Sequence, residues 1–358
     1  MGAAKKYNFL VFVIVIAAIA LLTALSTAEV LNQYIQTVIM SIGINIIFAA
    51  SLNIVNGYMG EFSCGHAGFM AVGAYVSSIL SMILFTENKF SGDPLLPPEL
   101  SIVLFPGVIA VGGIAAAVAG LLVAVPSFKT RDDYLAIITI ASNYIIMTAI
   151  NNLEVAGASR GLMGMKNTIR AMSSVVPIAW MLLWVLLFVA LSILAISRLM
   201  NSVLGKGIST IRYDEISAEI MSVNTNKMKL LAFCFSSGLA GVAGGLFAHM
   251  LGFINPASFN IMKSTEGMVM VYLGGMGSLS GSVLSAVFFT FLLQVLQPLQ
   301  ILKWVFIPLL LILLMQFRPE GLMGNKELSY FLSRFKRKAG GGAAPETPSG
   351  AGGKGAGK

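Results

Sequence analysis

Residues 102–125, IVLFPGVIAVGGIAAAVAGLLVAV, form an apolar stretch without a charged side chain. A run of about 20 such residues has the length that a helix needs to cross the hydrocarbon core of a membrane. The chain contains a series of comparable runs separated by polar segments. Because lipid offers no hydrogen bonds to the backbone, only helices and closed barrels can occupy it, and runs of this length favour helices.

The composition supports the same fold class. Of the 358 residues, 57% are hydrophobic and only 11% are charged, fewer charges than a soluble domain of this length carries. The sequence therefore predicts an all-α, polytopic integral membrane protein with about ten transmembrane helices. The expected spans are 9–27, 33–56, 65–86, 102–125, 134–150, 176–197, 230–251, 264–276, 282–298 and 301–317.

The distribution of basic residues indicates the orientation. With ten spans and the N-terminus inside, 17 of the 23 Lys and Arg residues fall on the inner side and 6 on the outer side. This bias follows the positive-inside rule, so the net charge of +8 reflects topology and attraction to anionic membrane lipid, not nucleic-acid binding. We expect a multi-pass protein of the plasma (inner) membrane with both termini in the cytoplasm.

The two ends of the chain differ from the rest. Lys5 and Lys6 precede an apolar run as in a signal peptide, but this run is longer than a signal core and many spans follow, so we expect an uncleaved first span. Residues 1–325 form the expected membrane domain. Residues 326–358 begin basic and become rich in Gly, Ala and Pro, a composition that predicts a disordered cytoplasmic tail.

Residues 205–229, GKGISTIRYDEISAEIMSVNTNKMK, form a polar insert on the expected inner side. The pattern predicts a short amphipathic helix from Asp214 to Ser222, with Asn224 and Asn226 at its exit. A membrane protein that presents one dedicated helix on one side has something to dock there. This feature suggests a channel-forming subunit that a separate motor drives.

The charges of this short helix favour a protein partner over a lipid surface. Ile216 and Ile220 are four residues apart and share one face, Glu215 and Glu219 line the opposite flank, and Asp214 can cap the first turn. The alternative is a helix that lies on the membrane, but such helices are normally basic because the inner leaflet is negative.

The sequence contains no motif typical of a nucleotide-binding site, a metal site or a catalytic site. The stretch 274–281, GGMGSLSG, resembles a phosphate loop but lacks the following Lys-Ser/Thr, so a turn between two spans is the favoured interpretation. Cys64, Cys234, His66 and His249 lack metal-ligand spacing, and we expect free thiols and packed or hydrogen-bonded histidines. We therefore expect no cofactor, no metal and no catalytic residue in this chain.

Polar side chains inside the spans are the candidates for a translocation path. Asn53, Asn143 and Tyr144 could line such a path, and hydrogen bonding between helices is the alternative for them. Glu266 lies near the outer end of its span. There it could sit in a helix first turn capped by Ser264, or it could meet the ammonium group of a substrate.

Two further patterns in the sequence concern how the helices pack and whether the chain contains a repeat. Small residues recur at four-residue spacing in the fourth and seventh spans, which predicts close helix packing in lipid. They are Gly112, Ala116 and Gly120, and Ser237, Gly241 and Gly245. In addition, residues 59–63, MGEFS, resemble residues 276–280, MGSLS, either by chance or as part of a parallel repeat.

Six segments in a fixed order carry a family resemblance. They are NIVNGYMGEFSCGHAGFMAVGAY (53–75), DDYLAIITIASNYI (132–145), IRYDEISAEIMSVNTNKMKLLAF (211–233), GFINPASF (252–259), VYLGGMGSLSGSVLSA (271–286) and FRPEGLMG (317–324). Together they resemble the permease subunit of the branched-chain amino acid ABC importers, and within it the LivM-like member of the permease pair. The resemblance extends over most of residues 37–325.

The resemblance implies partners and a coupling site. It implies a second, homologous permease subunit, two cytoplasmic ATPase subunits that use ATP-Mg, and an extracytoplasmic substrate-binding protein. By the same analogy the helix from Asp214 to Ser222 is the coupling helix held in a cleft of an ATPase. The residues expected to couple the ATPase are Arg212, Asp214, Glu215, Ile216, Glu219 and Ile220.

The favoured function is therefore the membrane permease of an ATP-driven importer of branched-chain, hydrophobic amino acids. Related permeases carry urea and short amides, which is the first alternative. An ion-coupled secondary transporter would need paired intramembrane acids, and a membrane enzyme would need a clustered catalytic constellation; the sequence offers neither.

The charge bias makes the topology testable. We predict that Lys5 and the tail after Arg318 are cytoplasmic, and that segments 87–101 and 151–175 face outward. Labelling of single-cysteine variants with an impermeant thiol reagent checks this. A cysteine at Asp93 that reacts only from the inner side would contradict the topology.

Overall fold

A computed structural model describes residues 31–85, 100–128 and 134–302 of the chain. It also describes short pieces outside these ranges, namely 22–23, 26–27, 96–97, 305, 309, 312–313, 316–317 and 321–323. Three expected features, the first span 9–27, the loop 87–101 and the last span 301–317, lie mostly outside the described residues. The expected tail 326–358 lies wholly outside them.

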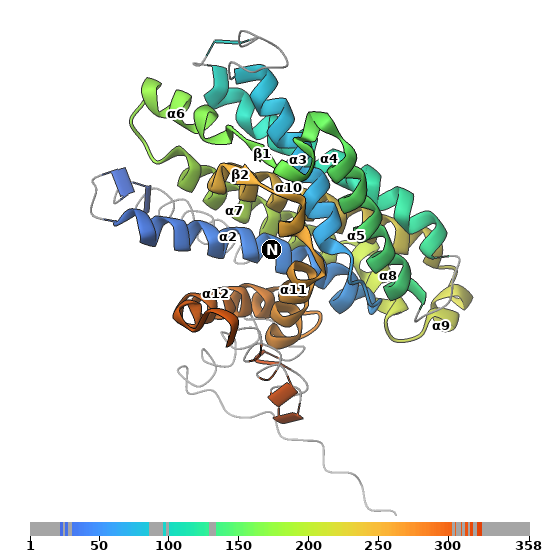
Figure 1. Ribbon diagram of the computed structural model, residues 1–358. Helices are drawn as coiled ribbons and strands as arrows, with labels where there is room; N and C mark the ends of the chain where they lie inside the picture. Colours follow the sequence, from blue (N-terminus) through green and yellow to red (C-terminus); the bar gives the residue numbers. More distant parts are fainter. Residues whose placement is uncertain are drawn as a thin grey trace, which may run out of the picture.

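The described part of the chain is a bundle of long helices (Figure 1). Those long and apolar enough to cross a membrane are α2 (Gln33–Asn53, continued by the π-helix η1, Ile54–Met59), α3 (His66–Phe85), α4 (Ser101–Ser127), α5 (Tyr134–Asn152), α7 (Trp180–Asn201) and α10 (Thr225–Leu251). The shorter helices α11 (Ile261–Gly274) and α12 (Leu279–Val295) follow. These helices coincide with the second to the ninth expected spans, which confirms the all-α membrane fold. The total number of spans stays a prediction.

Short elements connect the long helices. Between α5 and α7 lie η3 (Glu154–Ala156), η4 (Ala158–Arg160), β1 (Leu162–Met163) and α6 (Met165–Val175). Between α7 and α10 lie α8 (Val203–Ile211) and α9 (Glu215–Ile220). The remaining elements are β2 (Phe253–Ile254) and η5 (Pro256–Phe259) before α11, and η6 (Gln297–Leu302) after α12.

The two short strands mark one end of the bundle, here called the strand end. β1 and β2 pair antiparallel, with Leu162 opposite Ile254. The segment that follows α5 and the segment that follows α10 therefore meet at the same end. Both segments are expected on the same side of the membrane, so their relative placement agrees with the expected topology.

The opposite end, here called the α9 end, gathers the segments expected inside. The guanidinium Nη1 of Arg212 donates to the carbonyl of Met276 in the turn between α11 and α12, at 3.4 Å. The backbone N–H of Leu322 donates to the carbonyl of Leu273 at 2.8 Å, so residues 321–323 lie near this turn as well. Three distant parts of the sequence thus share one end of the bundle.

Close packing around α10 holds the bundle together. Helix α10 lies against α3, α4 and α2 (Figure 1). The two predicted ridges of small residues face each other: a Cβ added to Gly241 would lie 2.3 Å from the Cβ of Ala116, and one added to Gly120 would lie 2.0 Å from Oγ of Ser237. The prediction that these ridges pack helices together is confirmed, since neither glycine leaves room for a side chain.

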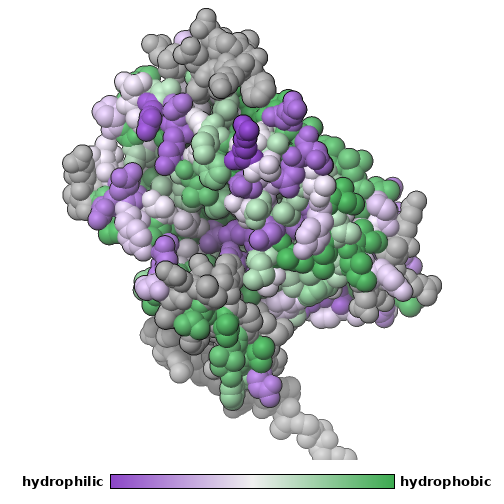
Figure 2. All heavy atoms as spheres, viewed as in Figure 1, coloured by the Kyte–Doolittle hydropathy of each residue, from purple (hydrophilic) through white to green (hydrophobic). Residues whose placement is uncertain are grey.

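The outward faces of α4 and α5 are apolar. Figure 2 shows hydrophobic residues gathered over this region of the molecule. Exposed side chains there include Ile114 and Leu122 of α4 and Ile137 and Ile145 of α5. A bundle that turns aliphatic side chains outward over the length of two helices is suited to lipid, because apolar surface of this extent is unfavourable in water.

Tight helix packing generates a stability prediction. A Cβ at Gly244 of α10 would lie 1.9 Å from the carbonyl oxygen of Met70, so Gly244→Val must push α3 and α10 apart. We expect it to destabilise the protein by more than the roughly 1–3 kcal/mol of ordinary overpacking, because the obstacle is backbone. The measurement is the thermal midpoint of the detergent-solubilised protein.

The control for this prediction is Gly107→Val in α4. Among the described residues, no heavy atom outside the neighbouring backbone of α4 lies within 4 Å of the position that a Cβ would take at Gly107. Both substitutions replace Gly by Val within a helix, so they change the helix propensity equally. If the thermal midpoint falls equally in both variants, the loss of stability comes from helix propensity and not from the contact between α3 and α10.

Candidate functional site

The short helix of the insert is built as the sequence predicts. Asp214 is its N-cap: a carboxylate oxygen accepts the N–H groups of Ile216 at 3.0 Å and Ser217 at 3.1 Å. The hydroxyl of Ser217 donates to the other oxygen at 2.6 Å. These hydrogen bonds hold the pKa of Asp214 below its usual value, and the hydrogen bond from the Ser217 hydroxyl contributes most. The helix itself covers Glu215–Ile220, shorter than expected, because the backbone turns left-handed at Ser222.

The face of α9 that points away from the bundle is apolar. Ile216 and Ile220 are 72% and 77% exposed, and the neighbouring Tyr213 and Met221 are equally open. Ala218, on the opposite side of the helix, is buried. These four exposed apolar side chains lie close together in the sequence, on and beside α9.

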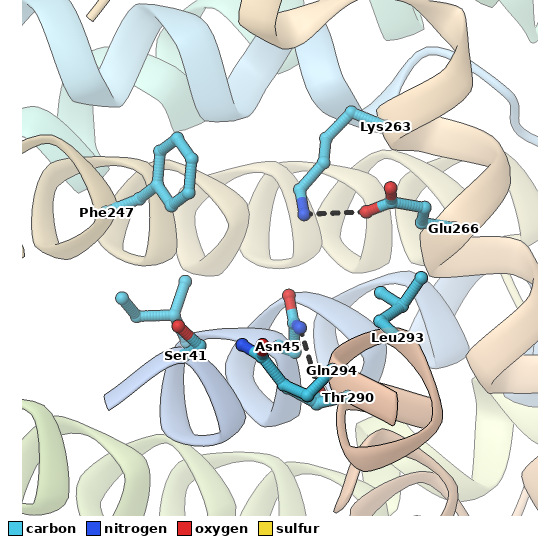
Figure 3. A pocket seen from close by; sticks show the side chains of 9 residues that line it. Ser41, Asn45, Phe247, Lys263, Glu266, Thr290, Leu293 and Gln294 are labelled. Carbon is cyan, nitrogen blue, oxygen red and sulfur yellow. Dashed lines mark hydrogen bonds and ion pairs between the residues drawn. The ribbon is translucent and has the colours of Figure 1, made fainter. Parts of the chain in front are cut away.

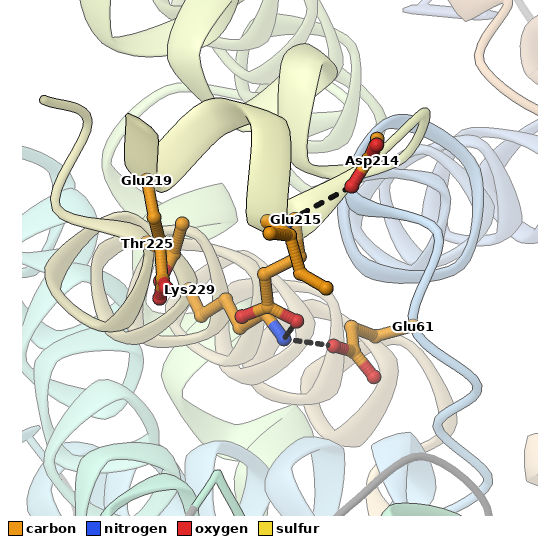
Figure 4. A network of polar contacts seen from close by, with 7 residues as sticks. Glu61, Asp214, Glu215, Glu219, Thr225 and Lys229 are labelled. Atoms are coloured by element: carbon orange, nitrogen blue, oxygen red, sulfur yellow. Dashed lines mark hydrogen bonds and ion pairs between the residues drawn. The ribbon is translucent and has the colours of Figure 1, made fainter. Parts of the chain in front are cut away.

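An ion network ties α9 to the body of the protein (Figure 4). The ammonium group of Lys229, on the second turn of α10, lies 2.6 Å from a carboxylate oxygen of Glu61 and 2.8 Å from one of Glu215. The Lys229 and Glu61 side chains are largely buried. Next to this network, the hydroxyl of Thr225 donates to Glu219 at 2.8 Å.

This network divides the predicted coupling residues into two groups. Asp214, Ile216, Glu219 and Ile220 are exposed on α9 or at its N-cap and can meet a partner. Glu215 and Arg212 point toward the bundle, where they hold the insert to other elements. Sequence reasoning missed Glu61 and Lys229 as part of this site, because no local pattern relates residues so far apart in the chain.

The two similar motifs of the sequence meet at this end. The aligned glycines, Gly60 and Gly277, both adopt a left-handed backbone, with φ of 82° and 79°. A Cβ at Gly60 would lie 2.9 Å from the side chain of Arg212, and one at Gly277 would lie 2.7 Å from the same side chain. The shared glycines therefore serve the same local purpose: each makes a tight turn that leaves space for Arg212.

Asn53 joins α2 to the turn between α11 and α12. Its amide nitrogen donates to the carbonyl of Ser278 at 3.0 Å, and its amide oxygen accepts the N–H of Gly277 at 3.0 Å. Both ends of the amide are thus engaged in contacts between helices. This geometry matches the hydrogen-bonding alternative for Asn53, while a role in the translocation path stays a prediction.

Two neighbours on α5 have opposite surroundings. Asn143 is fully buried, and a Cβ on Gly68 of α3 would lie 2.8 Å from its amide oxygen. Within the described residues neither polar atom of this amide has a hydrogen-bond partner. Tyr144 is half exposed on the outer face. Asn143 therefore faces the bundle and not the surroundings, and its part in a path stays a prediction.

Glu266 lies in a cavity of about 220 Å³ toward the strand end (Figure 3). This space is called the α2–α11 cavity here. Its lining residues come from α2, α10, α11 and α12, and they are Ser41, Ile44, Asn45, Phe247, Lys263, Glu266, Thr290, Leu293 and Gln294. A carboxylate oxygen of Glu266 lies 2.8 Å from the ammonium group of Lys263. The cavity therefore combines one ion pair with amide, hydroxyl and aliphatic groups.

Two capping assignments from the sequence are wrong. Ser264 does not cap α11: the side chain of Asn260 does, by accepting the N–H of Lys263. Asn224 does not end α9 but caps α10, by accepting the N–H of Lys227 at 3.1 Å. In both places an Asn precedes the helix and its side chain accepts the N–H three residues on, which is the usual hydrogen bond of an N-cap.

His66, the first residue of α3, is a packing residue. Nε2 of His66 lies 2.7 Å from Oγ of Ser236, and its ring meets Phe69 and Phe233 edge-on. This is the hydrogen-bonded, packed role expected from the sequence. In the part of the chain that the structure describes, no three His, Cys, Asp or Glu side chains are grouped so as to hold a metal.

The fold and these two ends define a class of protein. A bundle of apolar helices with a tethered, exposed helix at one end and a charged cavity at the other is suited to a membrane permease. The comparison with known families is more specific. The chain belongs to the family of permease components of branched-chain amino acid transport systems, which matches residues 26–315.

Individual relatives agree with this membership. The chain is 30% identical over 304 residues to LivM of Escherichia coli K12, a high-affinity branched-chain amino acid transport system permease protein; the match covers 78% of this chain and 68% of LivM. It is 24% identical over 328 residues to the probable LivM of Methanocaldococcus jannaschii, covering 82% and 94%. LivH of E. coli K12 is 24% identical over 306 residues, covering 79% and 92%. No solved structure matches the chain.

The buried amide of Asn143 allows a test of its role. Asn143→Leu removes an unpaired polar group from a buried site, so we expect protein level and thermal stability to stay the same or rise. If Asn143 acts on the path, the transport rate should fall several-fold in the same membranes. Ser142→Ala on the same helix is the control. A loss of transport in proportion to a loss of protein would show that Asn143 only joins helices.

Proposed function

We propose that this chain is the permease through which branched-chain amino acids enter the cell, driven by ATP that separate subunits bind and hydrolyse. The family membership supports the substrate class and the role as a transport subunit, not an enzyme. It favours this function over the urea and short-amide alternative. ATP-Mg would act in two cytoplasmic ATPase subunits.

The observation that carries the coupling proposal is the exposed apolar face of α9. Ile216 and Ile220 are exposed on a helix that the ion pair between Glu215 and Lys229 joins to α10. Apolar groups at an aqueous end are unfavourable unless a partner covers them. The acids Asp214 and Glu219 beside them oppose contact with an anionic lipid surface, so a groove on a protein is the better cover.

The orientation follows from the same argument. We place the α9 end and both termini in the cytoplasm and the strand end outside, since 17 of 23 basic residues then lie inside. A substrate-binding protein would deliver the amino acid at the strand end. The relatives include proteins named LivM and LivH, which supports a second, homologous permease as the partner within the membrane.

If α9 transmits the action of the ATPase, the ATPase must bind α9 differently in the two states of the permease. An ATPase can shift the permease between outward-open and inward-open states only if it binds the two states with different affinity. A helix joined by Lys229 to α10 and to the loop after η1 moves with those elements. The difference in affinity between states can therefore arise at α9.

Co-purification tests the proposal directly. The chain, expressed with its candidate partner permease and ATPases, should yield an assembly that imports leucine, isoleucine or valine into proteoliposomes only when ATP is supplied. An ion-coupled transporter would instead move substrate without ATPase subunits and would respond to an ion gradient. Transport by this chain alone under a gradient would overturn the proposal.

A charge on α9 should uncouple the motor. Ile220→Asp places an unpaired carboxylate in the proposed interface, where such a charge is strongly unfavourable, so ATP-driven import should be abolished while the chain still inserts and folds. The readout is substrate-stimulated ATP turnover with import in the same vesicles.

The matched control is Val155→Asp, which puts the same charge on an exposed apolar position at the strand end. Its effect on ATP turnover should be small. Normal stimulated turnover in the assembled Ile220→Asp complex would contradict the coupling role of α9.

A further inference from the structure

The α2–α11 cavity carries an ion pair in a setting that is mostly sheltered from solvent. The Lys263 and Glu266 side chains are only 16% and 14% exposed. Charged groups with so little contact with water are unfavourable unless they are paired. Here each neutralises the other, and the ring of Phe247 lies 5.7 Å from the Lys263 ammonium group, which adds a cation–π contact.

This pair keeps unused hydrogen-bonding capacity. Lys263 has three N–H groups and uses one on Oε2 of Glu266. Within the described part of the chain, the other two and Oε1 of Glu266 have no hydrogen-bond partner. A donor for a carboxylate and an acceptor for an ammonium group therefore stand side by side at the cavity (Figure 3).

The rest of the lining is divided between apolar and uncharged polar groups. Ile44, Leu293 and Phe247 offer an aliphatic and aromatic surface. Across from the ion pair, the amide of Asn45 donates to the hydroxyl of Thr290 at 2.9 Å. Figure 2 shows hydrophilic surface in the recess between the region of α10 and that of α11 and α12. Such a site suits a small molecule with both charges at one end and an apolar body.

We propose that the α2–α11 cavity is a transient binding site for the zwitterionic head of an amino acid. The ammonium group meets Glu266, the carboxylate meets Lys263, and the aliphatic side chain lies against Ile44 and Leu293. This inference rests on the proposed function, and it adds to it a site on the permease itself. The cavity lies toward the strand end, where a delivered amino acid would first meet this chain.

The ion pair also explains how binding can remain weak. With the cavity empty, Lys263 and Glu266 pair with each other; with it filled, each also meets a charge of the ligand. Neither state leaves a buried charge without a partner, so entry and release avoid the large penalty of an isolated ion. A transport site needs this property, because very tight binding would slow release.

Transport by the assembled complex is the first test. We expect Glu266→Gln and Lys263→Met each to lower the rate of leucine import, measured per amount of assembled complex, about tenfold or more. Because each variant leaves the other charge of the pair without its partner, the yield of the complex is measured alongside the rate. The controls are Glu154→Gln and Lys166→Met, exposed charges at the same end of the bundle, which should transport like the parent. Import by both cavity variants at the parent rate would overturn the proposal.

A charge swap separates binding from a structural role. The double variant Lys263→Glu, Glu266→Lys keeps an ion pair between the same two positions of α11. If the pair only stabilises the helix, the swap should restore transport, and that result would overturn the proposal. We expect no restoration, because the donor and the acceptor for the two ligand charges have exchanged places.

Thiol protection tests binding without relying on turnover. In a complex whose chain carries Ser41→Cys, Cys64→Ala and Cys234→Ala, leucine should slow the reaction of the new cysteine with a methanethiosulfonate reagent. At the same concentration, 4-methylpentanoate, which lacks the ammonium group, and 3-methylbutylamine, which lacks the carboxylate, should not. Equal protection by the analogues, or none by leucine, would overturn the zwitterion site.

Import by the parent complex shows whether a negative result counts against the cavity site or against the proposed function. If the parent imports branched-chain amino acids but the cavity variants and the protection assay show no effect, only the cavity site fails. If the parent imports none of them, the proposed function fails, whatever the cavity binds.

Discussion

Backbone contact between α10 and its neighbours is the constraint on which the structure depends. Helices in lipid gain little from the hydrophobic effect when they associate, so close van der Waals contact between small residues must hold them. Gly244 lies against the carbonyl of Met70, and Gly241 lies against Ala116 and the backbone of Gly73, with no space for a larger side chain. These contacts set the positions of α3, α4 and α10 relative to one another.

The same helices reach both ends of the protein. Helix α10 carries Lys229, which holds α9, and Phe247, which lines the α2–α11 cavity. Helix α11 begins with Lys263 and Glu266 at the cavity and ends at the turn that Arg212 contacts. A displacement of α9 therefore acts on two helices that also shape the opposite end. Under the proposed function, this shared framework is how a motor at one end can change a substrate site at the other.

Polar residues were harder to interpret from the sequence than apolar ones. The ridges of Gly and Ala could be predicted as helix contacts, because their spacing alone places them on one face. The cap of α9 by Asp214 could also be predicted, since it is a contact between near neighbours. The roles of Asn53 and Asn143 could not, because an amide in a span has the same pattern whether it joins two helices or lines a space between them.

The sequence by itself determined the membrane fold, the placement of the long helices and the acidic, amphipathic helix of the insert, since each depends on composition or on residues within a few turns of each other. Only the tertiary structure decided that Glu61 and Glu215 share Lys229, and that Lys263 and Glu266 face a cavity formed with α2 and α12. Those contacts join segments far apart in the chain. Local hydropathy carries no information about which segments meet, because packing of the whole bundle sets that choice.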